Sequence, residues 1–132
     1  MTAVWTALSV AVGGALGALA RLGLERSLGG DALDHSTLLV TLTINTVGAA
    51  ALGLLRRPQS LQPPPWLRAG LSVGFLGAFT TWSAVMVQVQ LVSIGGDWLL
   101  AAGYLIATIG LGLLAARWGM ASTAPEPGGT ER

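Results

Sequence analysis

Polar side chains that could contact an ion stand inside otherwise apolar stretches of this 132-residue sequence. Asn45 is the clearest case, because it lies in the middle of an uncharged run with Thr41, Thr43 and Thr46 close by. An amide placed in hydrocarbon without a hydrogen-bond partner carries a large free-energy cost. Asn45 must therefore either bond a neighbouring helix or face an aqueous pore as a donor. We favour the pore, because a polar residue at membrane depth is a functional candidate by default.

A second polar stretch covers residues 74–83 and reads Gly-Phe-Leu-Gly-Ala-Phe-Thr-Thr-Trp-Ser. Two glycines three apart, followed by two threonines and a serine, mark a place where a membrane helix can break. Broken backbone at membrane depth is tolerated only where its freed groups bind an ion, line water or meet protein. Two interpretations stay open here: carbonyls that coordinate a cation, and a glycine notch that serves packing alone.

Two further positions complete the set of polar candidates. Tyr104 and Thr108 are four residues apart and share a helix face that Gly112 continues. They form either a polar track or hydroxyls bonded within the helix bundle. Arg21 lies near the end of an apolar run, where it could extend to the interface or pair with Glu25 four residues on.

Long apolar helices must position these residues. Hydrophobic residues make up 52% of the chain and charged residues 10%, whereas about a quarter of the residues in an ordinary soluble domain are charged. Four stretches contain no Asp, Glu, Lys or Arg, and each can cross roughly 30 Å of hydrocarbon at about 1.5 Å per helical residue. These stretches are residues 2–20, 36–55, 69–96 and 98–116.

The fold class is therefore an all-α integral membrane protein with four transmembrane helices, the third broken near its middle. We predict these helices at Ala3–Leu24, Thr37–Leu55, Trp66–Ile94 and Trp98–Trp118. They form one domain, residues 1–120. Residues 121–132 are rich in Pro, Gly and Thr and are predicted to be a disordered tail.

Other functional classes lack the residues that they need. A net charge of +1, with no cluster of arginines, offers no basic surface to a nucleic acid. With no cysteine and only His35 as a histidine, the chain has neither a thiolate nor a multi-histidine metal site. No span carries a set of acid, base and nucleophile, so an enzyme is not expected.

Small residues and arginines bear on assembly and orientation. Gly13 and Gly17, like Gly70 and Gly74, are four residues apart, a spacing that lets helix backbones approach closely. Four short helices enclose little space, so we expect any aqueous path to run between subunits. The arginine distribution weakly favours cytoplasmic termini and leaves dual insertion open. Arg56, Arg57, Arg68, Arg117 and Arg132 share one side, and Arg21 and Arg26 share the other.

Three stretches together resemble the signature regions of the Fluc (CrcB) fluoride channels. They are residues 13–21, the Asn45-Thr46-Val47-Gly48 run and residues 74–83, and the match covers all four helices in order. The resemblance implies an antiparallel, dual-topology dimer in the cell membrane with two fluoride pores. Such a channel exports fluoride passively and holds a structural sodium ion, which is not transported, at the dimer centre.

The resemblance also assigns roles to individual residues. Asn45 resembles the pore asparagine, and the backbone carbonyls of Gly77 and Thr80 fall where the family binds sodium. Further pathway positions are implied at Thr81, Ser83, Tyr104 and Thr108, and Arg21 is expected to attract anions to a vestibule. The chain departs from the family at its phenylalanine box, where Trp82 and Val85 replace two phenylalanines. On this basis Val85→Phe is expected to raise flux if the missing ring limits conduction.

Three functional classes remain in view. The first is a fluoride channel that conducts as a homodimer. The second, favoured by the altered phenylalanine box, is a non-conducting partner subunit in a heterodimer with a related chain. The third is a small multidrug-resistance-type exporter, which needs an intramembrane carboxylate that the first helix lacks before Glu25.

Overall fold

A computed structural model describes residues 2–31, 34–56 and 63–122 of the chain. The predicted disordered tail, residues 121–132, lies outside the described residues beyond Ser122. The same holds for Arg57 and Arg132, which entered the comparison of the two membrane sides.

The described residues are helical and contain no strand. Four segments are long and apolar enough to cross a membrane, as the uncharged runs predict. The first, second and fourth are single helices: α1 (Thr2–Leu28), α2 (His35–Leu54) and α6 (Trp98–Ala121). The third is composite and comprises α3 (Pro65–Ala69), the π-helix η2 (Gly70–Leu76), α4 (Gly77–Phe79) and α5 (Trp82–Ile94).

The first helix runs four residues beyond its predicted end at Leu24. Sequence reasoning ended it where the apolar run meets charge, but charge does not stop a helix. Arg21 and Glu25 pair across one turn at 3.1 Å, which supports the helix beyond the apolar run. The helix ends at Leu28, directly before Gly29 and Gly30.

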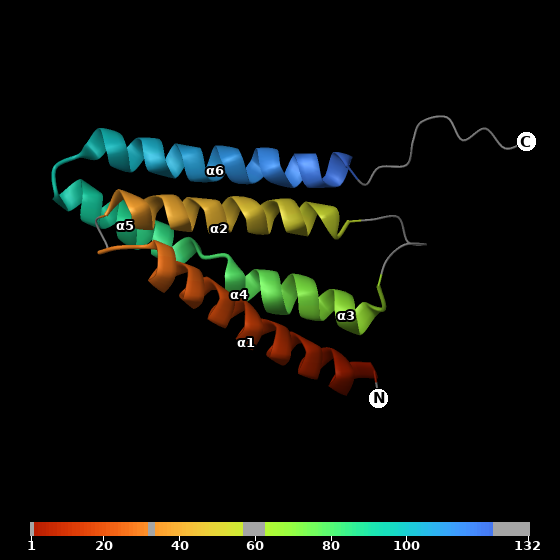
Figure 1. The fold of residues 1–132 in the computed structure, drawn as a ribbon. Helices are drawn as coiled ribbons and strands as arrows, with labels where there is room; N and C mark the ends of the chain where they lie inside the picture. The colour runs from red at the N-terminus through yellow and green to blue at the C-terminus, as the bar shows by residue number, and fades with distance from the viewer. Residues whose placement is uncertain (1, 32–33, 57–62, 123–132) are drawn as a thin grey trace, which may run out of the picture.

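The helices form two closely packed pairs. α2 packs along α6, and α1 packs along the segment α3–η2–α4, as Figure 1 shows. α2 makes far fewer contacts with η2 and α4 than with α6. α5, which continues the third span after α4, contacts both α2 and α6, and α1 also contacts α2. The third span thus lies against α1 over α3, η2 and α4, and against α2 and α6 over α5.

Glycines permit the close approach within each pair. A Cβ atom at Gly13 or Gly17 of α1 would collide with backbone of η2, at Gly70 and Phe75 respectively. In the other pair, a Cβ at Gly53 of α2 would collide with the backbone of α6. Without side chains at these positions, backbones touch directly, which is how helices gain packing contacts in lipid.

Candidate functional site

Regular helix stops between α4 and α5, in the stretch that sequence reasoning singled out. Thr80 has a ψ angle of 154°, and Thr81 has φ −145° and ψ 122°, so both residues are extended. We call these two residues the interruption. The Thr81 hydroxyl accepts a hydrogen bond from the Ala84 N–H at 3.2 Å and so caps the start of α5.

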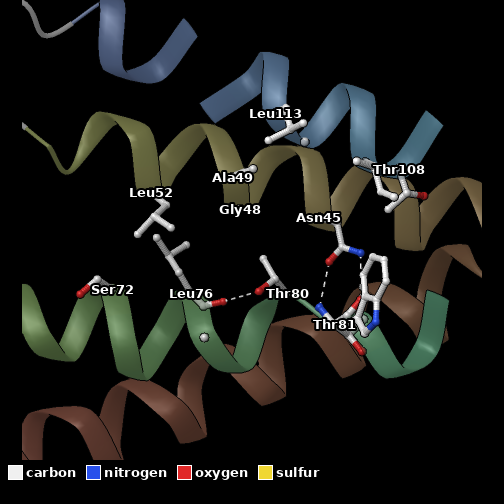
Figure 2. Close-up of a pocket in the computed structure, with 14 residues that line it drawn as sticks. Asn45, Gly48, Ala49, Leu52, Ser72, Leu76, Thr80, Thr81, Thr108 and Leu113 are labelled. Carbon is white, nitrogen blue, oxygen red and sulfur yellow. Dashed lines mark hydrogen bonds between the residues drawn. The ribbon is translucent and has the colours of Figure 1, made fainter. Parts of the chain in front are cut away.

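Asn45 of α2 binds the backbone of the interruption through both the nitrogen and the oxygen of its side-chain amide. Its Nδ2 donates to the Thr81 carbonyl at 2.9 Å, and its Oδ1 accepts from the Thr81 N–H at 2.8 Å (Figure 2). An amide nitrogen has two hydrogens, so one donor remains for another acceptor. Asn45 therefore bonds a neighbouring segment and still has a hydrogen to offer.

These bonds divert two donors from the helical pattern. In an unbroken helix the Thr81 N–H would bond the Gly77 carbonyl, and the Ala84 N–H would bond the Thr80 carbonyl. Here the Thr81 N–H bonds Asn45 and the Ala84 N–H bonds the Thr81 hydroxyl. The carbonyls of Gly77 and Thr80 are thereby left without these helical donors.

A cavity of about 440 Å³ opens beside the interruption, between α2, the third span and α6. Its lining is mainly apolar, with Leu52, Leu76 and Leu113 among the contributors (Figure 2). The described residues that line it include no Asp, Glu, Lys or Arg. Among the predicted site residues it brings together Asn45, Gly77, Thr80, Thr81, Trp82 and Thr108.

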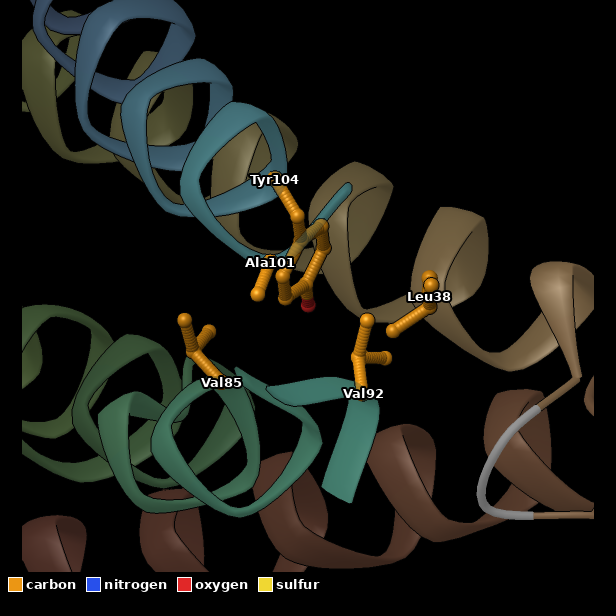
Figure 3. Packing of buried hydrophobic residues seen from close by; sticks show 5 residues of the cluster. All are labelled: Leu38, Val85, Val92, Ala101 and Tyr104. Atoms are coloured by element: carbon orange, nitrogen blue, oxygen red, sulfur yellow. The ribbon is translucent and has the colours of Figure 1, made fainter. Parts of the chain in front are cut away.

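Three other predicted residues, Val85, Ser83 and Tyr104, do not line this cavity. Val85 is fully buried among Leu38, Val92, Ala101 and Tyr104, as Figure 3 shows, and it does not line the cavity. Ser83 is exposed, and its hydroxyl lies 3.3 Å from that of Thr81. The Thr108 hydroxyl donates to the Tyr104 carbonyl at 2.8 Å.

Sequence reasoning missed Gln88, which is buried in α5. Its Nε2 donates to the Thr41 hydroxyl at 2.9 Å, and its Oε1 accepts from the Tyr104 hydroxyl. This chain of three side chains joins α2, α5 and α6. The signal that singled out Asn45, an amide at membrane depth, could have found Gln88 as well. Among the described residues, the hydroxyls of Thr43 and Thr46 bond carbonyls of their own helix, at Leu39 and Leu42.

Arg21 of α1 reaches the opposite side of the interruption. Its Nε donates to the Ala78 carbonyl at 3.2 Å, and its Nη1 pairs with Glu25 at 3.1 Å. Arg21 and Glu25 also line a second cavity of about 400 Å³, together with Gln88 and Thr41. Of the two expectations from sequence, pairing with Glu25 is the one observed.

The described residues contain no group of three or more His, Asp or Glu side chains that could hold a metal ion. A cation at this site would therefore rely on backbone carbonyls. The available chemistry is that of neutral donors and acceptors, namely an amide, hydroxyls, the Trp82 indole and backbone groups.

Four apolar spans around a polar interruption define a multi-pass membrane protein. Comparison with known proteins narrows this class. The family model described as "CrcB-like protein, Camphor Resistance (CrcB)" matches residues 8–120. The chain therefore belongs to the CrcB family, which confirms the resemblance found in its sequence.

Similar proteins in other organisms carry the name of a fluoride channel. The fluoride-specific ion channel FluC 2 of Geobacillus kaustophilus is 35% identical over 90% of this chain and 93% of its own. FluC 2 of Symbiobacterium thermophilum is 43% identical, with 83% and 89% covered. FluC of Gloeobacter violaceus is 40% identical, with 83% and 87% covered. These are channel names, in agreement with the expectation that the chain is not an enzyme.

Proposed function

We propose that this chain is a subunit of a fluoride-specific ion channel in the cell membrane. The channel lets fluoride leave the cell passively and so lowers its toxicity in the cytoplasm. The observation that carries the proposal is the uncharged cavity at the interruption, with Asn45, Thr81, Trp82 and Thr108 on its wall, in a chain similar to named fluoride channels.

The chemistry of this cavity suits fluoride. The ion is small and strongly hydrated, so a pore must replace its water with several donors and still release it. Neutral donors such as the second Asn45 amide hydrogen, the Thr81 hydroxyl and the indole N–H of Trp82 supply this without a fixed charge that would trap the anion. We assign the pathway to Asn45, Thr81, Trp82, Ser83, Tyr104 and Thr108, and we add Gln88 because it joins Tyr104 to Thr41.

The working unit is an antiparallel dimer of dual topology. Trp82 is 57% exposed, and Ser83 beside it is also exposed, near the middle of the third span. Polar groups at this depth are not left facing lipid, because the hydrocarbon offers them no partner. A second copy of the chain would cover them and complete each pathway between the two subunits. We propose that the interruption is the break that this architecture requires in the third helix.

A structural sodium ion fits the backbone around the interruption. The carbonyls of Gly77 and Thr80 lack the helical donors described above, because those N–H groups bond Asn45 and Thr81. Unwound carbonyls are the ligands that membrane proteins offer to sodium. Bound there, the ion would hold the interruptions of two subunits together at the dimer centre without being transported.

A non-conducting partner subunit is the second candidate. It is favoured by Val85, which stands where the family's second phenylalanine is expected and offers no ring edge to an anion. A chain of this kind would conduct only with a related chain as partner. The names FluC 1 and FluC 2 among the similar proteins are in keeping with such paired chains.

Fluoride efflux from liposomes that contain only this purified chain tests both candidates. A fluoride electrode follows efflux, with protein-free liposomes and a chloride electrode as controls. Rapid efflux of fluoride without chloride would support conduction by a homodimer. Absence of efflux from folded, dimeric protein would overturn homodimer conduction and favour the partner subunit, which co-reconstitution with a related chain would then test.

A further inference from the structure

The guanidinium of Arg21 bonds two different partners, one through Nε and one through Nη1. Nε donates to the Ala78 carbonyl at 3.2 Å, and Nη1 contacts the two carboxylate oxygens of Glu25 at 3.1 and 3.4 Å. Its side chain is 30% exposed and that of Glu25 is 25% exposed. The arginine is thus held against the third span by one bond and oriented by the other.

The Ala78 carbonyl belongs to the end of the helix that precedes the interruption. The last carbonyls of a helix have no donors of their own helix and carry a partial negative charge. Asn45 binds the other side of the interruption, at Thr81, from α2. Two side chains from two different helices therefore hold the chain just before and within the interruption.

The pairing with Glu25 weakens the alternative role of Arg21 as a free charge that attracts anions. A carboxylate at 3.1 Å cancels most of the field that the guanidinium would produce at longer range. Arg26, the next arginine along α1, is exposed, and no salt bridge to it occurs among the described residues.

We propose that Arg21 is a positioning residue that fixes the end of α4 through Ala78, with Glu25 orienting its guanidinium. Ala78 lies next to Gly77 and two residues before Thr80, so release of Ala78 would displace the carbonyls on both sides of it. The consequence for flux rests on the proposed channel function, whereas the consequence for backbone order does not.

The charge-retaining substitution Arg21→Lys separates the two roles. Lysine keeps the positive charge but lacks the planar set of donors that bonds Ala78 and Glu25 together. If Arg21 positions the helix end, Arg21→Lys and Arg21→Gln should both reduce fluoride efflux by about tenfold, since each loses a charge-assisted hydrogen bond. If Arg21 attracts anions, Arg21→Lys should conduct like the wild type.

Ionic strength gives a second separation. Attraction of anions is screened by salt, because the Debye length falls to about 3 Å at 1 M. The deficit of Arg21→Gln should therefore persist when potassium salt is raised at fixed sodium. A deficit that disappears at high salt would overturn the proposal. Arg26→Gln serves as the matched control on the same helix and should leave efflux unchanged.

Hydrogen exchange tests the proposal without reference to flux. In Arg21→Lys, the backbone amides of residues 77–84 should exchange roughly tenfold faster than in the wild type, with α6 unchanged, because local order is lost. Unchanged exchange in this segment would overturn the proposal even if the protein conducts no fluoride. Should both Arg21 variants fail to fold, Glu25→Gln, which keeps the bond to Ala78 and frees only the orienting contact, should show the same local increase to a smaller extent. No increase in Glu25→Gln would overturn the role given to Glu25.

Discussion

The side-chain amide of Asn45 makes two hydrogen bonds to the backbone of a single residue, Thr81. Its two bonds to Thr81 satisfy the N–H and the carbonyl of an extended residue in the middle of a membrane span. Without them these groups would lack partners in a region that contains no water. The residue singled out as a pore donor is thus also the residue that makes the interruption possible.

Substitution of Asn45 should therefore affect both stability and conduction. We expect Asn45→Ala to lower the free energy of unfolding by about 1–3 kcal/mol, because a donor and an acceptor of Thr81 lose their partners. Fluoride efflux should fall with it. Thermal unfolding of the purified protein and liposome efflux measure the two effects. Thr43→Val is the matched control on α2, since the Thr43 hydroxyl donates to the Leu39 carbonyl of its own helix. Equal losses in both variants would contradict the role of Asn45.

The buried position of Val85 changes the result that we expect from its substitution. Val85 is 0% exposed and packs among Val92, Ala101 and Tyr104. We expect Val85→Phe to overpack this cluster and to cost about 1–3 kcal/mol of stability instead of raising flux. Val87→Phe, on the same helix at a site that is 55% exposed, should unfold at nearly the wild-type temperature. A gain in efflux with unchanged stability in Val85→Phe would show that the ring can be accommodated.

The contact between α1 and η2 leaves no room for a side chain at Gly13 or Gly17. The wider turn of a π-helix lies here against a glycine face of α1. π-Helical turns are rare and are frequently found at functional sites. In this chain the π-helix directly precedes α4 and the interruption, so its packing on α1 sets where these elements lie.

A pair of glycines on α1 tests this contact. We expect Gly17→Ala to destabilise the protein by about 1–3 kcal/mol, because the new methyl group would meet the backbone of Phe75 and force the helices apart. Gly23→Ala is the control. Nothing lies within 4 Å of a Cβ atom at Gly23, so alanine there should be neutral or stabilise the helix by up to about 1 kcal/mol. Equal unfolding temperatures for both variants would argue against a tight contact.

The described part of the chain presents a largely apolar exterior. Large side chains such as Leu99, Ile106 and Leu113 are mostly exposed, while the buried cluster is small. Hydrophobicity cannot drive such helices together in lipid, so close packing and polar bonds must do so. The exposed Trp82 and Ser83 interrupt this apolar exterior in the third span, which is why we place the second subunit there.

Dual topology can be tested directly because the chain contains no cysteine. A single cysteine introduced as Asp31→Cys, at the exposed end between α1 and α2, should react with an impermeant maleimide from both sides of the membrane in roughly equal shares. The small arginine imbalance gives no strong orientation signal. Labelling from one side only would exclude an antiparallel dimer of this chain with itself. A cysteine placed in the middle of a span, as Ile106→Cys, should stay unlabelled from either side.

Much of the fold followed from local sequence. Uncharged runs predicted the four helices to within a few residues, and the error at the end of α1 arose because the Arg21–Glu25 pair continues a helix beyond its apolar part. Part of the candidate site followed too: Asn45, Thr81 and Thr108 do meet on one cavity. Sequence reasoning missed Gln88 and did not foresee that Val85 is buried away from this cavity, because one helix read alone does not reveal which of its faces points into the subunit.

The sequence alone was enough to establish the membrane class, the number of spans and the family, since a bilayer forces the backbone into helices whose signals lie within about twenty neighbouring residues. The partners of the polar groups needed the folded chain. Asn45 meets Thr81 across 36 residues, and Arg21 meets Ala78 across 57. Helical periodicity assigns a residue to a face but not to a neighbour, and here the glycine contacts between backbones bring the faces together.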